Sequence, residues 1–105
     1  MNVRATRIVG DPAKADAAGT ASYQAMVASM KQVDGFLGAV LLVDRTTGSS
    51  VGLTFWESER ALRASEEVAT KFRSEGASAI GATGTPTVER FEVAYYGAPQ
   101  PSNVR

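Results

Sequence analysis

The 105 residues of this sequence include neither histidine nor cysteine. Without cysteine the chain has no disulfide, no thiolate ligand for a metal and no thiol nucleophile. Without histidine it lacks the commonest general base and the commonest metal ligand, which excludes a Ser-His-Asp triad and histidine-ligated haem, zinc or iron. We therefore expect no metal and no cofactor. Proton transfer would have to rely on a carboxylate, a tyrosine or water.

An excess of either charge is also missing. The sequence has 11 basic and 11 acidic residues, and the basic residues are scattered, so no field gathers nucleic acid or anionic lipid. No apolar stretch approaches the ~20 residues of a membrane span, and residues 1–5 show no signal-peptide core. We expect a cytoplasmic protein that binds neither nucleic acid nor membrane.

The run Phe36–Val43 is apolar at every position. Side chains of a strand point alternately to opposite faces, so a strand with one wet face should alternate apolar with polar residues. Simple alternation divides the run into two apolar sets: Leu37, Ala39, Leu41 and Val43 on one face, and Phe36, Val40 and Leu42 on the other. A chain of this length can cover one face with its own helices. The second face therefore predicts another subunit or an apolar ligand.

The pattern along the chain predicts the order strand, helix, strand, strand, helix, strand. The strands are expected at 3–9, 36–44, 51–57 and 87–96, and the helices at 13–33 and 59–75. This order is the ferredoxin-like βαββαβ arrangement, an α+β fold with a four-stranded antiparallel sheet and both helices on one face. Residues 1–97 would form a single domain and residues 98–105 a C-terminal tail. A homodimer through the bare sheet face would cover the remaining apolar surface.

Capping residues and apolar stripes define the two helices. Asp11 and Pro12 suit the start of the first helix, Ser58 suits the start of the second, and Gly19 predicts a kink or a split. The first helix should bury Tyr23, Met26, Val27, Met30 and Val33. The second should bury Leu62, Ser65, Ala69 and Phe72, joined by Ala61 and Val68. Residues 76–86 are rich in small side chains and predict a loop, either a mobile lid or a plain connector.

Two segments carry a resemblance to a known family. The segment Thr54–Ser65, with Phe55-Trp56-Glu57-Ser58 at its centre, resembles the junction of the third strand and second helix in antibiotic-biosynthesis-monooxygenase-like (ABM) proteins. The segment Gly35–Val40 is similar to their passage from the first helix to the second strand. The resemblance implies a dimeric α+β barrel with a ligand pocket between the helices and the sheet of each subunit.

Within that family, some members oxidise quinols or polycyclic aromatics with oxygen and no cofactor, whereas others degrade haem. Haem-degrading members use an Asn on the first strand, a Trp and a helix His. Trp56 matches the Trp, but the chain has no histidine, and its first strand offers Arg4, Ala5 and Thr6 where the Asn would stand. The resemblance therefore implies a cofactor-independent monooxygenase acting on a small aromatic or quinol-type substrate. A non-catalytic, dimeric small-molecule-binding or stress-associated module is the alternative.

Trp56 and Tyr23 are the candidate catalytic residues, and both are also candidates for substrate binding. The indole of Trp56 could stack on an aromatic substrate and donate its N–H, or it could fill the core at the end of a strand. Tyr23 could donate to a substrate oxygen or serve as a core tyrosine. The other substrate-binding candidates are Met26, Met30, Phe72 and Arg7. Arg7 could pair with an anionic group of the substrate, or with Glu89 or Glu92 across the sheet.

Overall fold

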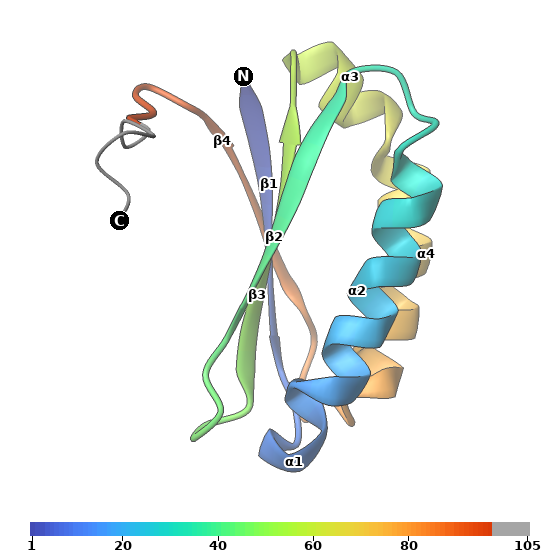
Figure 1. Cartoon of the computed structure of the whole chain (residues 1–105), viewed down its shortest axis with the longest axis vertical. Coiled ribbons are helices and arrows are strands. Elements are labelled where there is room, and N and C mark those ends of the chain that lie inside the picture. The colour runs from blue at the N-terminus through green and yellow to red at the C-terminus, as the bar shows by residue number, and fades with distance from the viewer. Residues whose placement is uncertain (98–105) are drawn as a thin grey trace, which may run out of the picture.

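A computed structural model describes residues 1–97 of the chain, and the predicted tail at 98–105 lies outside the described residues. The elements are β1 (Asn2–Val9), α1 (Pro12–Ala15), α2 (Ala17–Met30), β2 (Phe36–Val43), β3 (Ser49–Trp56), α3 (Glu59–Ala64), α4 (Glu66–Ala79) and β4 (Thr87–Glu92). The strands form one four-stranded antiparallel sheet in the order β2-β3-β1-β4. Figure 1 shows α2 and α4 side by side against one face of this sheet. The predicted α+β ferredoxin-like fold is confirmed.

The strand register separates the residues that face the helices from those on the outer face. On β1 the buried Arg4 hydrogen-bonds to α3, so Arg4, Thr6 and Ile8 face the helices. Their partners on β3 are Thr54, Gly52 and Ser50, which face the same way. The outer face then carries the alternate residues. Three rows cross it: Leu42, Val51, Arg7 and Thr87; Val40, Leu53, Ala5 and Glu89; Gly38, Phe55, Val3 and Phe91.

A β-bulge changes the predicted division of β2. The pairing with β3 shifts between Phe36 and Gly38, so Phe36 opposes Trp56 while Gly38 opposes Phe55. Because the bulge inserts one extra residue, Phe36 joins Ala39 and Leu41 on the helix face, and its predicted grouping with Val40 and Leu42 is wrong. Leu37, at the bulge, is 55% exposed.

Both predicted helix starts are capped as expected. The Asp11 carboxylate accepts from the Ala13 N–H at 2.9 Å, and the Ser58 hydroxyl accepts from the Ala61 N–H at 3.1 Å. The first helical region divides at Asp16 rather than at the predicted Gly19. The second divides at Ser65, whose buried hydroxyl donates to the Leu62 carbonyl at 2.6 Å and so competes with the backbone ladder.

The C-terminal ends of two elements differ from the prediction. Helix α4 continues to Ala79, so Gly76 lies inside a helix and the loop begins only at Ile80. That loop is fastened to the end of β1: the Asp11 N–H donates to the Ile80 carbonyl, and the Thr83 N–H to the Val9 carbonyl. These bonds favour the connector over the lid.

Strand β4 is shorter than predicted. It ends at Glu92, and Tyr95 and Tyr96 beyond it are 77% and 71% exposed. On α4, Val68 is 36% exposed instead of belonging to the buried stripe. A six-residue strand at the sheet edge has a single neighbour, β1, to hold it.

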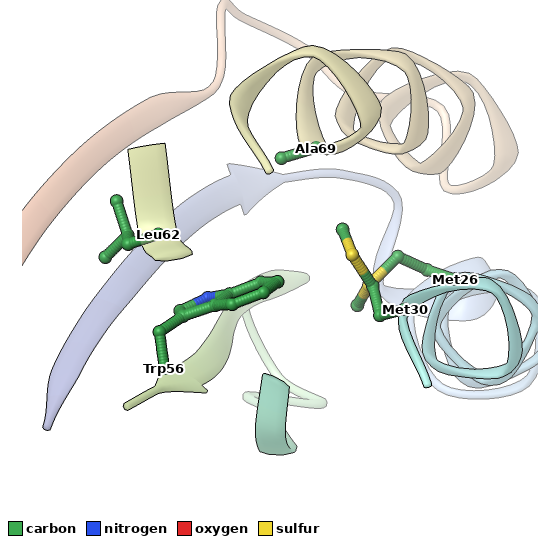
Figure 2. Close-up of a cluster of buried hydrophobic side chains, with 5 residues drawn as sticks. All are labelled: Met26, Met30, Trp56, Leu62 and Ala69. Atoms are coloured by element: carbon green, nitrogen blue, oxygen red, sulfur yellow. The ribbon is translucent and has the colours of Figure 1, made fainter. Parts of the chain in front are cut away.

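The core lies between the helices and the sheet. Its buried members are Met26, Met30, Trp56, Leu62 and Ala69, and Figure 2 shows them projecting inward from α2, β3, α3 and α4. Partly buried residues, including Tyr23, Phe36 and Phe72, pack against this cluster. No helix within residues 1–97 is long and apolar enough to span a bilayer.

Candidate functional site

A cavity of about 90 Å³ lies between the sheet and the two long helices. Its floor is a grid of neighbouring residues on the three strands: Arg4, Thr6 and Ile8 of β1, Thr54, Gly52 and Ser50 of β3, and Leu41 of β2. Small and hydroxyl side chains on β3 leave space that larger residues would fill. The cavity is therefore built into the middle of the sheet.

The helices supply the walls and roof of this cavity. Helix α2 contributes Gly19, Ser22, Tyr23, Met26 and Met30, α4 contributes Ala69, Phe72, Arg73 and Gly76, and Ile80 closes one end. Four of the predicted substrate-binding residues, Tyr23, Met26, Met30 and Phe72, thus line one cavity. The flexible thioethers can change rotamer at little cost, which gives the wall room to adapt to a ligand.

Tyr23 crosses the cavity from α2 and ends on β3. Its hydroxyl donates to the Leu53 carbonyl at 2.7 Å, and burial raises the pKa of this phenol well above its ordinary value. The ring lies directly over Gly52, where an added Cβ would come within 2.8 Å of the Tyr23 ring. The glycine is therefore needed for the ring to reach its acceptor. Tyr23 stays neutral at physiological pH, and its hydroxyl proton is already engaged in the bond to the Leu53 carbonyl.

Trp56 lies beside the cavity without lining it. The indole is 0% exposed, its ring meets Phe36 edge-on at 5.3 Å, and its N–H donates to the Thr54 hydroxyl at 3.0 Å. The predicted stacking on a substrate is not what this geometry provides. Instead, the indole face meets the guanidinium carbon of Arg4 at 5.8 Å, within cation–π range. Trp56 here fills the core and supports a charged neighbour.

Arg7 lies on the outer face of the sheet, away from the cavity. Its side chain donates to the Ser49 hydroxyl at 3.2 Å, and within residues 1–97 it forms no ion pair with Glu89 or Glu92. The prediction that Arg7 pairs across the sheet is therefore wrong in its partner. The structure does not bring Arg7 together with the other five candidate residues.

Two arginines that the sequence did not single out line the cavity. Arg4 is only 2% exposed, and its Nη2 donates to the Leu62 carbonyl and the Ser65 hydroxyl, each at 2.8 Å. Arg73 reaches the cavity from α4 and is half-buried. Burial lowers the pKa of both guanidinium groups, although an arginine remains charged under any physiological condition.

Glu66 forms ion pairs with two arginines, Arg4 and Arg90. It lies 3.2 Å from Nη2 of Arg4, and Arg90 grips both of its carboxylate oxygens through Nε at 2.7 Å and Nη2 at 2.9 Å. These bonds, above all the one from Arg90, lower the pKa of the Glu66 carboxyl to about 2. Arg4 and Arg90 thus share one carboxylate, and Arg73 forms no ion pair within residues 1–97, so this group carries an excess of positive charge.

We predict that Glu66→Gln lowers the free energy of unfolding at neutral pH and makes that free energy less dependent on pH in the acid range. A carboxylate with a depressed pKa stabilises the fold above its ordinary pKa of 4.5, and this contribution is lost as pH falls toward about 2. Because Glu66 is partly exposed, we expect a loss of about 1 kcal/mol at pH 7, near the range of surface pairs. Urea unfolding at several pH values would measure the wild-type advantage, which should shrink between about pH 5 and pH 2.

Glu59→Gln provides the control for that experiment, because Glu59 forms an exposed pair with Arg63 on α3. We expect a smaller loss there. A wild-type advantage over Glu66→Gln that stayed constant down to pH 2 would contradict the ionic role of Glu66.

A wide groove adjoins the cavity on the side of the edge strand β2. It lies between α2 and β2, and its lining includes Thr20, Gln24, Val27, Lys31 and Arg45. Tyr23 and Leu41 line both the groove and the cavity, so they form the boundary between the two. The groove therefore lies next to the cavity, on the other side of these two side chains.

Solved structures with the same fold are known. The monooxygenase from the gene ActVA-Orf6 of Streptomyces coelicolor, in complex with nanaomycin D, superposes with a TM-score of 0.75 at 21% identity over 94% of this chain and 92% of that chain. This protein has the ABM-like fold. SnoaB, a cofactor-independent oxygenase from Streptomyces nogalater, gives a TM-score of 0.66 at 19% identity over 94% of this chain and 97% of SnoaB. Rv0793 from Mycobacterium tuberculosis gives a TM-score of 0.69 at 18% identity over 92% of this chain and 98% of Rv0793.

Sequence relatives of this chain are found in Mycobacterium tuberculosis. The uncharacterized protein Rv2557 is 39% identical over 66 residues, which are 63% of this chain and 29% of Rv2557. The uncharacterized protein Rv2558 is 29% identical over 100 residues, which are 95% of this chain and 42% of Rv2558. The chain thus spans less than half the length of either relative. No family model matches it, and residues 1–97 hold no cluster of His, Cys, Asp and Glu suited to a metal ion.

Proposed function

We propose that the protein is a cofactor-independent oxygenase that oxidises a small aromatic or quinol-type molecule in the cavity between α2, α4 and the sheet. The observation that carries this proposal is the cavity itself, with a largely apolar lining and a few fixed polar groups. Two proteins with this fold, one named a monooxygenase and one a cofactor-independent oxygenase, support the same reaction class.

In such a reaction the substrate itself reduces oxygen. A hydroquinone loses a proton to give a carbanion, which adds O₂ at a ring carbon as a hydroperoxide. Loss of water then leaves a hydroxyquinone, with one oxygen atom of O₂ in the product and the other in water. The protein contributes orientation, exclusion of water and stabilisation of negative charge on the substrate oxygen. The hydroxyl of Tyr23 and the N–H of Trp56 are both engaged by protein acceptors, so charge stabilisation falls to the arginines.

The size of the cavity limits what can bind without movement. Its volume of about 90 Å³ is smaller than the ~150 Å³ of a cavity that accepts benzene, so the wall must yield. Met26 and Met30 can move with little strain, and the neighbouring groove can hold the rest of a larger substrate.

Oxygen consumption tests the proposal directly. A panel of hydroquinones, each incubated with the wild-type protein, should show uptake of O₂ together with the absorbance of the quinone. Ala69→Leu places added bulk in the cavity, and we expect it to reduce uptake about tenfold or more while costing about 1–3 kcal/mol of stability. Val68→Leu is the matched control, because Val68 is the exposed neighbour on the same helix.

The alternative is a non-catalytic binding module, and one observation favours it: the polar groups of Tyr23 and Trp56 are already engaged within the protein. Retained ligand binding with no oxygen uptake across the panel would establish this alternative and overturn the oxygenase. Uptake equal in Ala69→Leu and wild type, with both proteins folded by circular dichroism, would show that the cavity is not the site.

We also propose that the protein is a homodimer joined through the outer sheet face, and that it is cytoplasmic. Within residues 1–97 no element covers this face, as Figure 1 shows. Phe91, Leu42 and Val40 are 51%, 50% and 41% exposed there. Apolar side chains in three adjoining strand rows form a surface of the kind that a second copy would bury.

A further inference from the structure

The cavity has buried hydrogen-bond donors without acceptors. Nε and Nη1 of Arg4 are shielded from solvent and find no partner within residues 1–97, and the same is true of Nε and Nη2 of Arg73. Buried N–H groups are nearly always paired, and unpaired groups on a charged side chain are costly. Both side chains line the same cavity. The most economical acceptors for these four nitrogen atoms are the polar atoms of a bound ligand.

The arrangement of these donors indicates the shape of the acceptor. In a guanidinium group, Nε and Nη2 lie on one side and direct their N–H bonds in parallel, which matches the two oxygens of a carboxylate. The protein itself uses this pair on Arg90, whose Nε and Nη2 hold the two oxygens of Glu66. On Arg73 the same two atoms are unpaired.

The balance of charge also favours an anion. Among the ion pairs within residues 1–97, Glu66 is the one carboxylate bound to Arg4, and it is shared with Arg90. Arg73 forms no ion pair within the same residues. One further negative charge would bring the group of three arginines and one glutamate closer to neutrality.

We propose that Arg73 and Arg4 form a carboxylate-binding subsite, and that the natural ligand is a small aromatic acid whose ring enters the apolar part of the cavity. Arg73 would hold the carboxylate through Nε and Nη2. Arg4 would add a second cation and further donors beside it, with its position fixed by Leu62, Ser65 and the face of Trp56. Met26, Met30 and Phe72 would contact the ring.

This inference rests on the proposed function only in placing the ligand in the same cavity, and it does not require oxidation. Equilibrium binding of benzoate and of its neutral analogue benzamide, measured by calorimetry at pH 7, separates the two ideas. We expect benzoate to bind about tenfold or more tightly than benzamide, since charge-assisted bonds are the stronger ones. Arg73→Met should abolish this preference. Arg73→Lys, which keeps the charge but loses the paired donors, should recover only part of it.

Arg63→Met is the matched control, because Arg63 is exposed, pairs with Glu59 and does not line the cavity. Arg4→Met should also weaken benzoate binding, and its melting by circular dichroism shows whether the variant folds. Should it fail to fold, the Arg73 variants still decide the question. Equal affinity for benzoate and benzamide, or a preference unchanged by Arg73→Met, would overturn the subsite. Charge-selective binding without oxygen uptake would uphold the subsite and reject the oxygenase.

Discussion

Val40→Glu is expected to convert the proposed dimer into a monomer. Val40 lies on the outer sheet face in one row with Leu53 and Ala5, and 41% of it is exposed in the single chain. In a dimer joined through this face, the new carboxylate would be buried in an apolar contact without a partner, at a cost of several kcal/mol. The twofold symmetry introduces the substitution twice. We expect the dissociation constant to rise about a thousandfold or more.

Sedimentation equilibrium or light scattering at micromolar protein would measure the effect. The wild type should have twice the mass of one chain and Val40→Glu the mass of one. Val68→Glu serves as the control, because Val68 is a partly exposed valine on α4, on the side of the sheet opposite the outer face. It should leave the mass unchanged. A wild-type monomer, or a Val40→Glu variant that remains a dimer, would show that the outer face is not the interface.

Trp56→Ala should cause the largest loss of stability of any single substitution in the core. The side chain is fully buried, meets Phe36 edge-on, and belongs to the cluster with Leu62 and Met30. Removing a buried aromatic ring costs about 3–5 kcal/mol through lost burial and the hole left behind. Because small domains have a total stability of about 5–15 kcal/mol, the variant should be close to unfolding at physiological temperature.

Denaturant unfolding followed by circular dichroism is the suitable measurement, since the substitution removes the only tryptophan of the chain. Trp56→Phe should lose less, about 1–2 kcal/mol, because an aromatic ring remains while the bond to the Thr54 hydroxyl is lost. Val68→Ala, at an exposed apolar position, should cost under about 1 kcal/mol. A Trp56→Ala variant as stable as the wild type would contradict the core role assigned to this residue.

The order of the elements could be predicted because each strand and helix carries its own periodicity and its own end signals. Asp11 and Ser58 are examples. A capping side chain bonds within the first turn of its own helix, so the local sequence is enough to predict the cap. The bulge at Phe36 could not be predicted from alternation. In a run that is apolar throughout, moving one residue to the other face leaves the pattern equally apolar. The extra turn of α4 could not be predicted, because glycine is a usual signal for the end of a helix. At Gly76, packing against α2 overrides that signal.

The site was only partly visible in the sequence for a related reason. Tyr23, Met26, Met30 and Phe72 lie on apolar helix stripes, and such stripes must face the sheet. Arg4 was overlooked because arginines are mostly exposed, and its burial depends on Leu62, Ser65 and Glu66, more than fifty residues away. Its position on the same strand face as Thr6 and Ile8 was the one available signal. The spacing of residues in the sequence does not determine side-chain geometry, so it could not show whether Trp56 faces a ligand or Arg4.

The contact between Trp56 and Arg4 gives the protein an optical reporter of its own. The sole indole is shielded from water, so its fluorescence should lie toward the blue, and a guanidinium charge 5.8 Å from its ring influences that emission. An anion arriving beside Arg4 would alter the local field at the indole without touching it. The emission wavelength of Trp56 would then report whether a ligand occupies the cavity, without an added fluorescent label.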